Sequence, residues 1–320
     1  MIEGKPYLAM ELLKEPLENM PTGYLWEDSW TLWIKGFTCR MIGDFDFAID
    51  AFHEALNICE RRLWVDMVCY TDLGVIYHQQ GRLQEAQETF LHGLALQKFH
   101  TAANHGYLAR LIAGLCDVLL DRHELEESII NGNIGLEWLQ WWPSGNTWSD
   151  LFTVLGRVRL AEGDLKAASE LIFRADQERR SWPLRPINNS LVDDALVRLW
   201  LAQNDVGSLE HWAKFIGLEY QMRYNPDQIP DESIFKQLIS LARIRLAQGR
   251  AGNQVILKET SELLASLANA SQKSGRIRSR KTNGLTARSH RADPNRSPPM
   301  TRTNAAGSAK TISPTEGRCG

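Results

Sequence analysis

Residues 73–93 read LGVIYHQQGRLQEAQETFLHG, and the same kind of phrase returns along the chain. Its first half places apolar and small residues three and four positions apart, which predicts one face of a helix. Gly81 ends that helix, because glycine tolerates the left-handed backbone conformation that a helix end needs. A return helix is predicted over Leu83–Leu96, with Ala86 and Phe90 facing inward. The stretch therefore predicts two packed helices joined by a tight turn.

The phrase recurs about every forty residues, a period that is typical of a helical solenoid. Clear copies surround Gly43, Gly81 and Gly163, and weaker copies are centred on His123, Asn204 and Gly249. We expect residues 1–280 to form an all-α, right-handed helical-repeat solenoid of about six helix pairs. Residues 8–20 are expected to add one leading helix. Such a solenoid is first of all a binding surface.

The charge of the chain is divided between its two parts. Residues 1–270 carry 25 Lys and Arg against 37 Asp and Glu, whereas residues 271–320 carry 11 against 2. From Lys281 to Gly320 there is no Phe, Trp, Tyr or Val, so this segment cannot bury enough apolar area to offset the entropy of ordering its backbone. We predict a basic, disordered tail over residues 281–320. It would allow weak, salt-sensitive association with nucleic acids but no sequence-specific reading.

Several classes of protein are disfavoured by the sequence. The five cysteines form no CxxC pair, which favours reduced thiols in a cytoplasmic protein. No apolar run approaches the ~20 residues of a membrane span. The N-terminus lacks the layout of a signal peptide. Neither HExxH nor GxSxG occurs, so neither an enzyme nor a metal or cofactor site is expected.

The recurring phrase resembles a known family of repeats. The matching residues are Leu73, Gly74 and Tyr77, followed by Ala86, Phe90 and Gly93, at the offsets of the tetratricopeptide repeat (TPR). The longer unit here, with GRVRLAEGD at 156–164, RLWLAQND at 198–205 and LARIRLAQGR at 241–250, is similar to the repeat domain of large LuxR-family transcription regulators of the MalT-like type. The resemblance covers roughly residues 8–280.

In that family an ATP-binding domain precedes the repeats and a helix-turn-helix domain follows them. This chain has no G-x-x-x-x-G-K-[ST] phrase and no helix-turn-helix pattern after residue 280. The resemblance therefore implies the effector- or protein-binding sensor segment of a regulator, in truncated form. The alternative is a stand-alone TPR scaffold that docks peptides or partner proteins. Uncapped ends would leave apolar faces open, so self-association through them is also expected.

Alignment of the first helices on their turns identifies candidate ligand-binding residues. One repeat position holds Phe37, Val75, Asp117, Arg157, Arg198 and Arg243. In TPR solenoids this position lines the concave groove. Its three arginines would form a positive ladder suited to carboxylates, phosphates or an acidic peptide. The alternative is that each arginine pairs with a nearby acid such as Asp150, Asp193 or Asp194.

Tryptophans are concentrated at two places. Trp26, Trp30 and Trp33 have helical spacing and, with Phe37, could form an aromatic lining at the N-terminal end of the groove. The alternative is that they pack between helices. The second set, Trp138, Trp141, Trp142 and Trp148, either covers the joint between two repeats or anchors a partner.

Overall fold

The computed structural model describes residues 25–59, 64–99, 105–140, 145–181, 189–223, 232–250 and 253–275. All of them belong to the first of the two units into which the chain divides, Met1–Ser279 and Arg280–Gly320. Within these ranges the chain forms twelve α-helices, one short 3-10 helix and no strand, which confirms the predicted all-α repeat fold. The predicted leading helix and tail lie outside the described residues and stay predictions.

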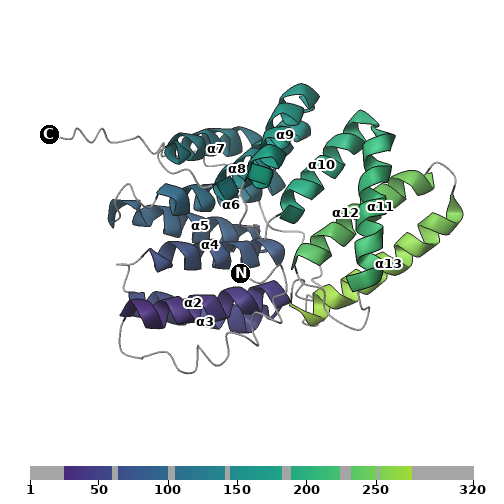
Figure 1. The fold of residues 1–320 in the computed structure, drawn as a ribbon. Coiled ribbons are helices and arrows are strands. Elements are labelled where there is room, and N and C mark those ends of the chain that lie inside the picture. The colour runs from purple at the N-terminus through teal and green to yellow at the C-terminus, as the bar shows by residue number, and fades with distance from the viewer. Residues whose placement is uncertain are drawn as a thin grey trace, which may run out of the picture. The chain divides into compact units, whose positions relative to one another are not determined.

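The helices form six consecutive pairs (Figure 1). The pairs are α2 (Leu25–Ile42) with α3 (Phe45–Cys59), α4 (Val65–Gln79) with α5 (Leu83–Leu94), α6 (His105–Asp121) with α7 (Leu125–Leu139), α8 (Gly145–Ala161) with α9 (Leu165–Ser181), α10 (Asn189–Gln203) with α11 (Val206–Arg223), and α12 (Glu232–Arg250) with α13 (Gln254–Lys273). The first helix of each pair contacts the first helix of the next. The second helices α3, α5, α7, α9 and α11 each contact the first helix of their own pair and that of the next pair, whereas α13 packs on α12. We call α2, α4, α6, α8, α10 and α12 the first-helix layer.

Five of the predicted turns share one backbone geometry. The left-handed residue is Gly43, Gly81, His123, Gly163 or Asn204, with φ between 56° and 89°. The residue after it donates its N–H to a carbonyl five positions earlier at 2.9–3.0 Å: Asp44 to Cys39, Arg82 to Tyr77, Glu124 to Leu119, Asp164 to Arg159 and Asp205 to Trp200. This is the Schellman arrangement, which satisfies carbonyls at the helix end. Glycine adopts this left-handed conformation without steric cost in three of the turns, and His123 and Asn204 adopt it in the other two.

The turn predicted at Gly249 is wrong. Gly249 lies inside α12, which continues to Arg250, and Asn253 caps the start of α13 by accepting a hydrogen bond from the backbone N–H of Ile256. A β-carbon at Gly249 would meet Leu257 Cδ2 at 2.4 Å. The small side chain at this position therefore allows α13 to approach α12 closely, and a packing requirement was mistaken for a helix stop.

Aromatic rings pack against glycines between neighbouring helices. Phe90 of α5 is fully buried between Gly74 of α4 and Gly114 of α6. A β-carbon on Gly74 or Gly114 would approach the Phe90 ring to 2.6 or 2.4 Å. Gly36 meets Phe52 in the same way one repeat earlier. The ring thus fills space that a larger residue in place of either glycine would occupy. This contact between ring and glycines sets the distance between the helices.

In the third pair, a cysteine replaces the glycine and forms polar contacts with a serine of the second helix. Cys116 of α6 occupies the position of Gly74, and its Sγ lies 3.2 Å from the Ser128 carbonyl oxygen, while Ser128 Oγ donates to the Cys116 carbonyl at 3.0 Å. Burial raises the pKa of the Cys116 thiol to about 12. The side chains of Cys39, Cys69 and Cys116 are buried in the helical core. Among the described residues no helix is both long and apolar enough to cross a membrane.

Candidate functional site

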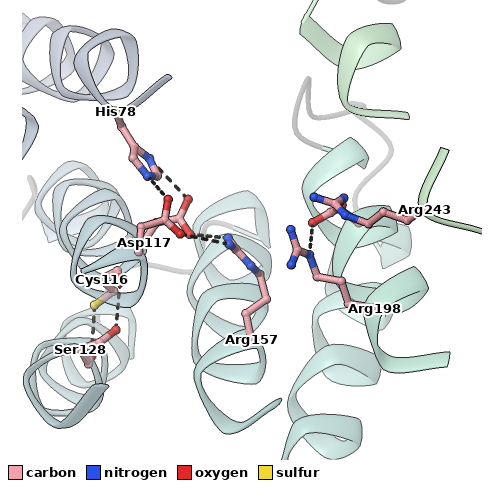
Figure 2. A network of polar contacts seen from close by, with 9 residues as sticks. His78, Cys116, Asp117, Ser128, Arg157, Arg198 and Arg243 are labelled. Atoms are coloured by element: carbon pink, nitrogen blue, oxygen red, sulfur yellow. Dashed lines mark hydrogen bonds and ion pairs between the residues drawn. The ribbon is translucent and has the colours of Figure 1, made fainter. Parts of the chain in front are cut away.

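Charged side chains gather on the first-helix layer (Figure 2). They come from five consecutive helix pairs, with one or two residues from each of α4, α6, α8, α10 and α12. We call this group the charged cluster; its members are His78, Asp117, Asp121, Arg157, Asp194, Arg198 and Arg243. First helices that lie side by side place one turn of each helix at the same level, so residues far apart in sequence meet.

One end of the charged cluster is built around α6. His78 Nε2 lies 2.8 Å from Asp121 Oδ2, and His78 Nδ1 lies 3.7 Å from Asp117 Oδ2. Arg157 of α8 pairs with Asp117 from the other side. Burial alone would lower the pKa of His78, but the hydrogen bond to Asp121 and the charges of both carboxylates outweigh it and raise that pKa. The hydrogen bond to His78 in turn lowers the pKa of Asp121.

The His78 contacts predict a stability that depends on pH. A histidine whose folded pKa is raised stabilises the fold fully below its ordinary value of 6.5, and the contribution is lost as pH rises through the folded pKa. His78→Gln should therefore cost about 1 kcal/mol at pH 6, because Asp121 is half-exposed and water screens the pair, and clearly less at pH 9. Urea denaturation of both proteins at the two pH values measures the difference.

A matched control for this experiment is His211→Gln, since His211 is exposed on α11. Its cost in unfolding free energy should stay below about 0.5 kcal/mol at pH 6 and at pH 9. Equal costs of His78→Gln at the two pH values would contradict the assignment of a charged His78 in the fold.

The other end of the charged cluster is centred on Asp194 of α10. Arg198 Nε donates to Asp194 Oδ2 at 2.6 Å, Ser240 Oγ donates to Asp194 Oδ1 at 2.8 Å, and Arg243 Nη1 donates to the same oxygen. Burial opposes ionisation of Asp194, but the two guanidinium groups outweigh it and lower its pKa. Burial and repulsion by Arg198 and Arg157 lower the pKa of Arg243 in spite of Asp194. Two guanidinium groups therefore lie close together around the single carboxylate of Asp194.

The structure places the three predicted arginines on neighbouring first helices in two groups: Arg157 pairs with Asp117, and Arg198 and Arg243 share Asp194 (Figure 2). Each pairs with an acid, and Asp194 is one of the partners that the pairing alternative names. Arg157 pairs with Asp117, which occupies the equivalent repeat position, rather than with Asp150. Their role in ligand binding stays a prediction. The sequence argument missed His78 and Asp121, although Asp121 follows Asp117 by one helical turn.

The predicted aromatic residues of α2 form a stack. The rings of Trp30 and Trp33 are 4.5 Å apart, those of Trp33 and Phe37 are 5.4 Å apart, and Trp64 packs against Trp30 at 5.0 Å. These side chains are half-buried against the core of the first two pairs. Trp33 Nε1 donates to Asp72 Oδ2 at 2.8 Å. The stack therefore packs between helices, and a ligand role for it remains a prediction.

The second tryptophan set is described only in part. Trp138 and Trp148 pack against the core, and the Trp148 ring stacks on Phe152 at 5.4 Å. Trp141 and Trp142 lie outside the described residues, as does the indole of Trp26.

A buried ion pair that the sequence argument did not anticipate joins the first pair to the sixth. Arg40 of α2 pairs with Glu232 of α12, and its Nε lies 3.2 Å from Asp72 Oδ1 of α4. The three side chains, which we call the Arg40 triad, are 5%, 8% and 3% exposed. Gln79 and Lys236 also donate to Glu232, at 2.9 and 2.6 Å. The triad thus links segments separated by 192 positions.

The arrangement is suited to binding charged groups. In the described part of the chain, no group of three or more His, Cys, Asp or Glu is placed to hold a metal ion. Three guanidinium groups on one face can donate paired hydrogen bonds to carboxylate or phosphate oxygens. The carboxylates between them hold the guanidinium groups in place.

Comparison with known proteins identifies the repeat type. The family model described as the MalT-like TPR region matches residues 2–288. Solved structures that resemble the chain include a Podosopora anserina protein described as kinesin light chain with nearly identical TPR-like repeats, with 17% identity, a TM-score of 0.41, and coverage of 64% of this chain and 94% of that one. A point variant of the same protein gives 17% identity, a TM-score of 0.42, and coverage of 65% and 95%. These structural likenesses carry no argument about function. No curated protein matched the chain.

Proposed function

The chain belongs to the MalT-like TPR region family, and we propose that it is a regulatory and interaction module that binds an effector or a protein partner on its first-helix layer. The observation that carries the proposal is the charged cluster, which is assembled from five consecutive helix pairs. A ligand on this surface would contact several repeats at once. It would favour one relative position of the repeats over others, which is how binding becomes a signal.

The resemblance to LuxR-family regulators suggests the use of such a signal. We propose that the module senses an effector for an ATPase domain and a DNA-binding domain of the same regulator. The flanking nucleotide sequence tests this role. Coding sequence for an ATPase domain upstream and a helix-turn-helix domain downstream would support it, whereas unrelated flanks would favour the stand-alone scaffold.

The binding surface can be tested with matched variants. A thermal-shift panel of nucleotides, phosphorylated sugars, dicarboxylates and acidic peptides should reveal ligands that raise the melting midpoint. Arg157→Gln, in the charged cluster, should weaken their binding at least tenfold, because a desolvated charged contact is lost. The control is Arg180→Gln, since the Arg180 side chain is 72% exposed and pairs with Asp176 of the same helix, α9. Equal weakening by both variants, or by neither, would contradict binding on the first-helix layer.

A further inference from the structure

Two arginines from neighbouring helix pairs share one carboxylate. Arg198 and Asp194 lie one turn apart on α10, and Arg243 reaches Asp194 from α12 (Figure 2). Arg157 of α8 lies close enough for its charge to act on both Asp194 and Arg243. Each guanidinium carries five N–H donors, whereas a carboxylate has two oxygens, one of which also accepts from Ser240. Donors therefore outnumber acceptor sites at this point.

The shared carboxylate is the buried part of the group. The Asp194 side chain is 16% exposed, while those of Arg198 and Arg243 are 37% and 32% exposed. An incoming molecule would therefore meet the edges of the two guanidinium groups before it met the carboxylate. This difference in exposure favours binding of an anion. The less exposed carboxylate holds the two guanidinium groups in position and, being farther from the ligand than they are, repels it less than they attract it.

Charge is distributed unevenly along the charged cluster. At the α6 end, Asp117 and Asp121 face His78 and Arg157. At the α10–α12 end, Asp194 alone faces both Arg198 and Arg243 in the described contacts. Burial in the first place, and then repulsion by Arg198 and Arg157, lower the pKa of Arg243. An anion between the two guanidinium groups would relieve this repulsion.

We propose that Arg198 and Arg243 bind the phosphate group of a small phosphorylated molecule, and this assignment rests on the proposed function. A phosphate group has three acceptor oxygens and a charge near −2, so it can accept paired hydrogen bonds from two guanidinium groups at once, whereas a carboxylate offers two oxygens and a single negative charge. The bound phosphate would bridge α10 and α12 as Asp194 does, and Arg157 would add attraction at longer range. The phosphorylated ligand would thus tighten the contact between the fifth and sixth pairs.

The test is calorimetric titration of the whole chain with glycerol 3-phosphate, inorganic phosphate and succinate. Wild-type protein should bind glycerol 3-phosphate, and Arg198→Gln or Arg243→Gln should each weaken that binding at least tenfold. Arg198→Lys and Arg243→Lys should weaken it as well, because lysine keeps the charge but loses the planar fork. Arg159→Gln on α8, which removes only a surface pair with Glu162, should leave the affinity within twofold.

The titrations with inorganic phosphate and succinate show which part of the ligand the site recognises. Binding of both phosphates with equal affinity would assign the site to the phosphate group itself, and tighter binding of the ester would assign it to a phosphorylated molecule. Absence of phosphate binding by folded wild-type protein, unchanged affinity in the arginine variants, or tighter binding of succinate would overturn the proposal. Circular dichroism melts of each variant show whether a lost affinity reflects unfolding. If phosphate fails but another ligand loses affinity in Arg157→Gln, the proposed function survives without this assignment.

Discussion

Phe90→Ala is expected to lower the free energy of unfolding by about 3–5 kcal/mol. The Phe90 ring is completely buried, and it fills the space left by Gly74 on one side and Gly114 on the other. Neither glycine has a side chain that could move into the cavity, so the site cannot collapse without a shift of whole helices. The cost should therefore lie near the upper end of the range. Urea denaturation followed by circular dichroism at pH 7 measures it.

Phe173→Ala is the matched control for this experiment. Phe173 lies on the second helix of another pair, α9, but 49% of it is exposed. Its replacement should change the unfolding free energy by no more than about 0.5 kcal/mol. Comparable losses in the two variants would show that burial between the glycines is not what makes Phe90 important.

Arg40→Met should also cost about 3–5 kcal/mol, for an electrostatic reason. The substitution replaces the guanidinium by an apolar side chain of similar length, so the buried Asp72 loses this ion pair and the buried Glu232 keeps its pair with Lys236. Burial already raises the pKa of Asp72, and removal of Arg40 takes away the main opposing charge. Arg159→Met, which breaks an exposed pair with Glu162, should cost less than about 1 kcal/mol under the same conditions.

Two further measurements separate the lost charge from lost packing. Neutralising the partners in Arg40→Met/Asp72→Asn/Glu232→Gln should restore most of the stability, because no charge then stays buried alone. The difference in unfolding free energy between wild type and Arg40→Met should also become smaller from pH 7 to pH 5. The buried carboxylates lose their charge on protonation, and a neutral group costs less free energy to bury. A difference that is independent of pH, together with no recovery in the triple variant, would point to packing.

The turns and the packing of neighbouring helices could be predicted because they depend on local residue types. Glycine suits a positive φ, as at Gly81, although His123 and Asn204 adopt the same conformation, and Gly74 leaves the space into which Phe90 packs. The turn and the close approach of the two helices recur along the repeats, so the residues that allow them appear at regular intervals in the sequence. The same reasoning failed at Gly249, because a glycine that serves close packing looks like a glycine that ends a helix.

The candidate site could be predicted only in part. The repeat position of Arg157, Arg198 and Arg243 follows from counting along each helix, and the three residues do lie on neighbouring first helices, each in an ion pair. Their partners do not follow, because the choice of Asp117 over Asp150 depends on the rotation and spacing of adjacent helices. Sequence spacing does not give the rotation or the spacing of the helices to within a few ångströms. An error of that size decides whether two charged side chains form an ion pair or remain separately solvated.

The sequence by itself determined the all-α repeat fold, five of the turns between paired helices and the repeat position that carries the arginines, since each of these is set by residues within one or two repeats. Only the tertiary structure decided that Arg198 and Arg243 share Asp194, and that Arg40 meets Glu232 across 192 positions. The physical reason is that small differences in rotation between successive pairs accumulate along a solenoid. Contacts between its distant members therefore depend on every joint between them, and no local pattern records that accumulated rotation.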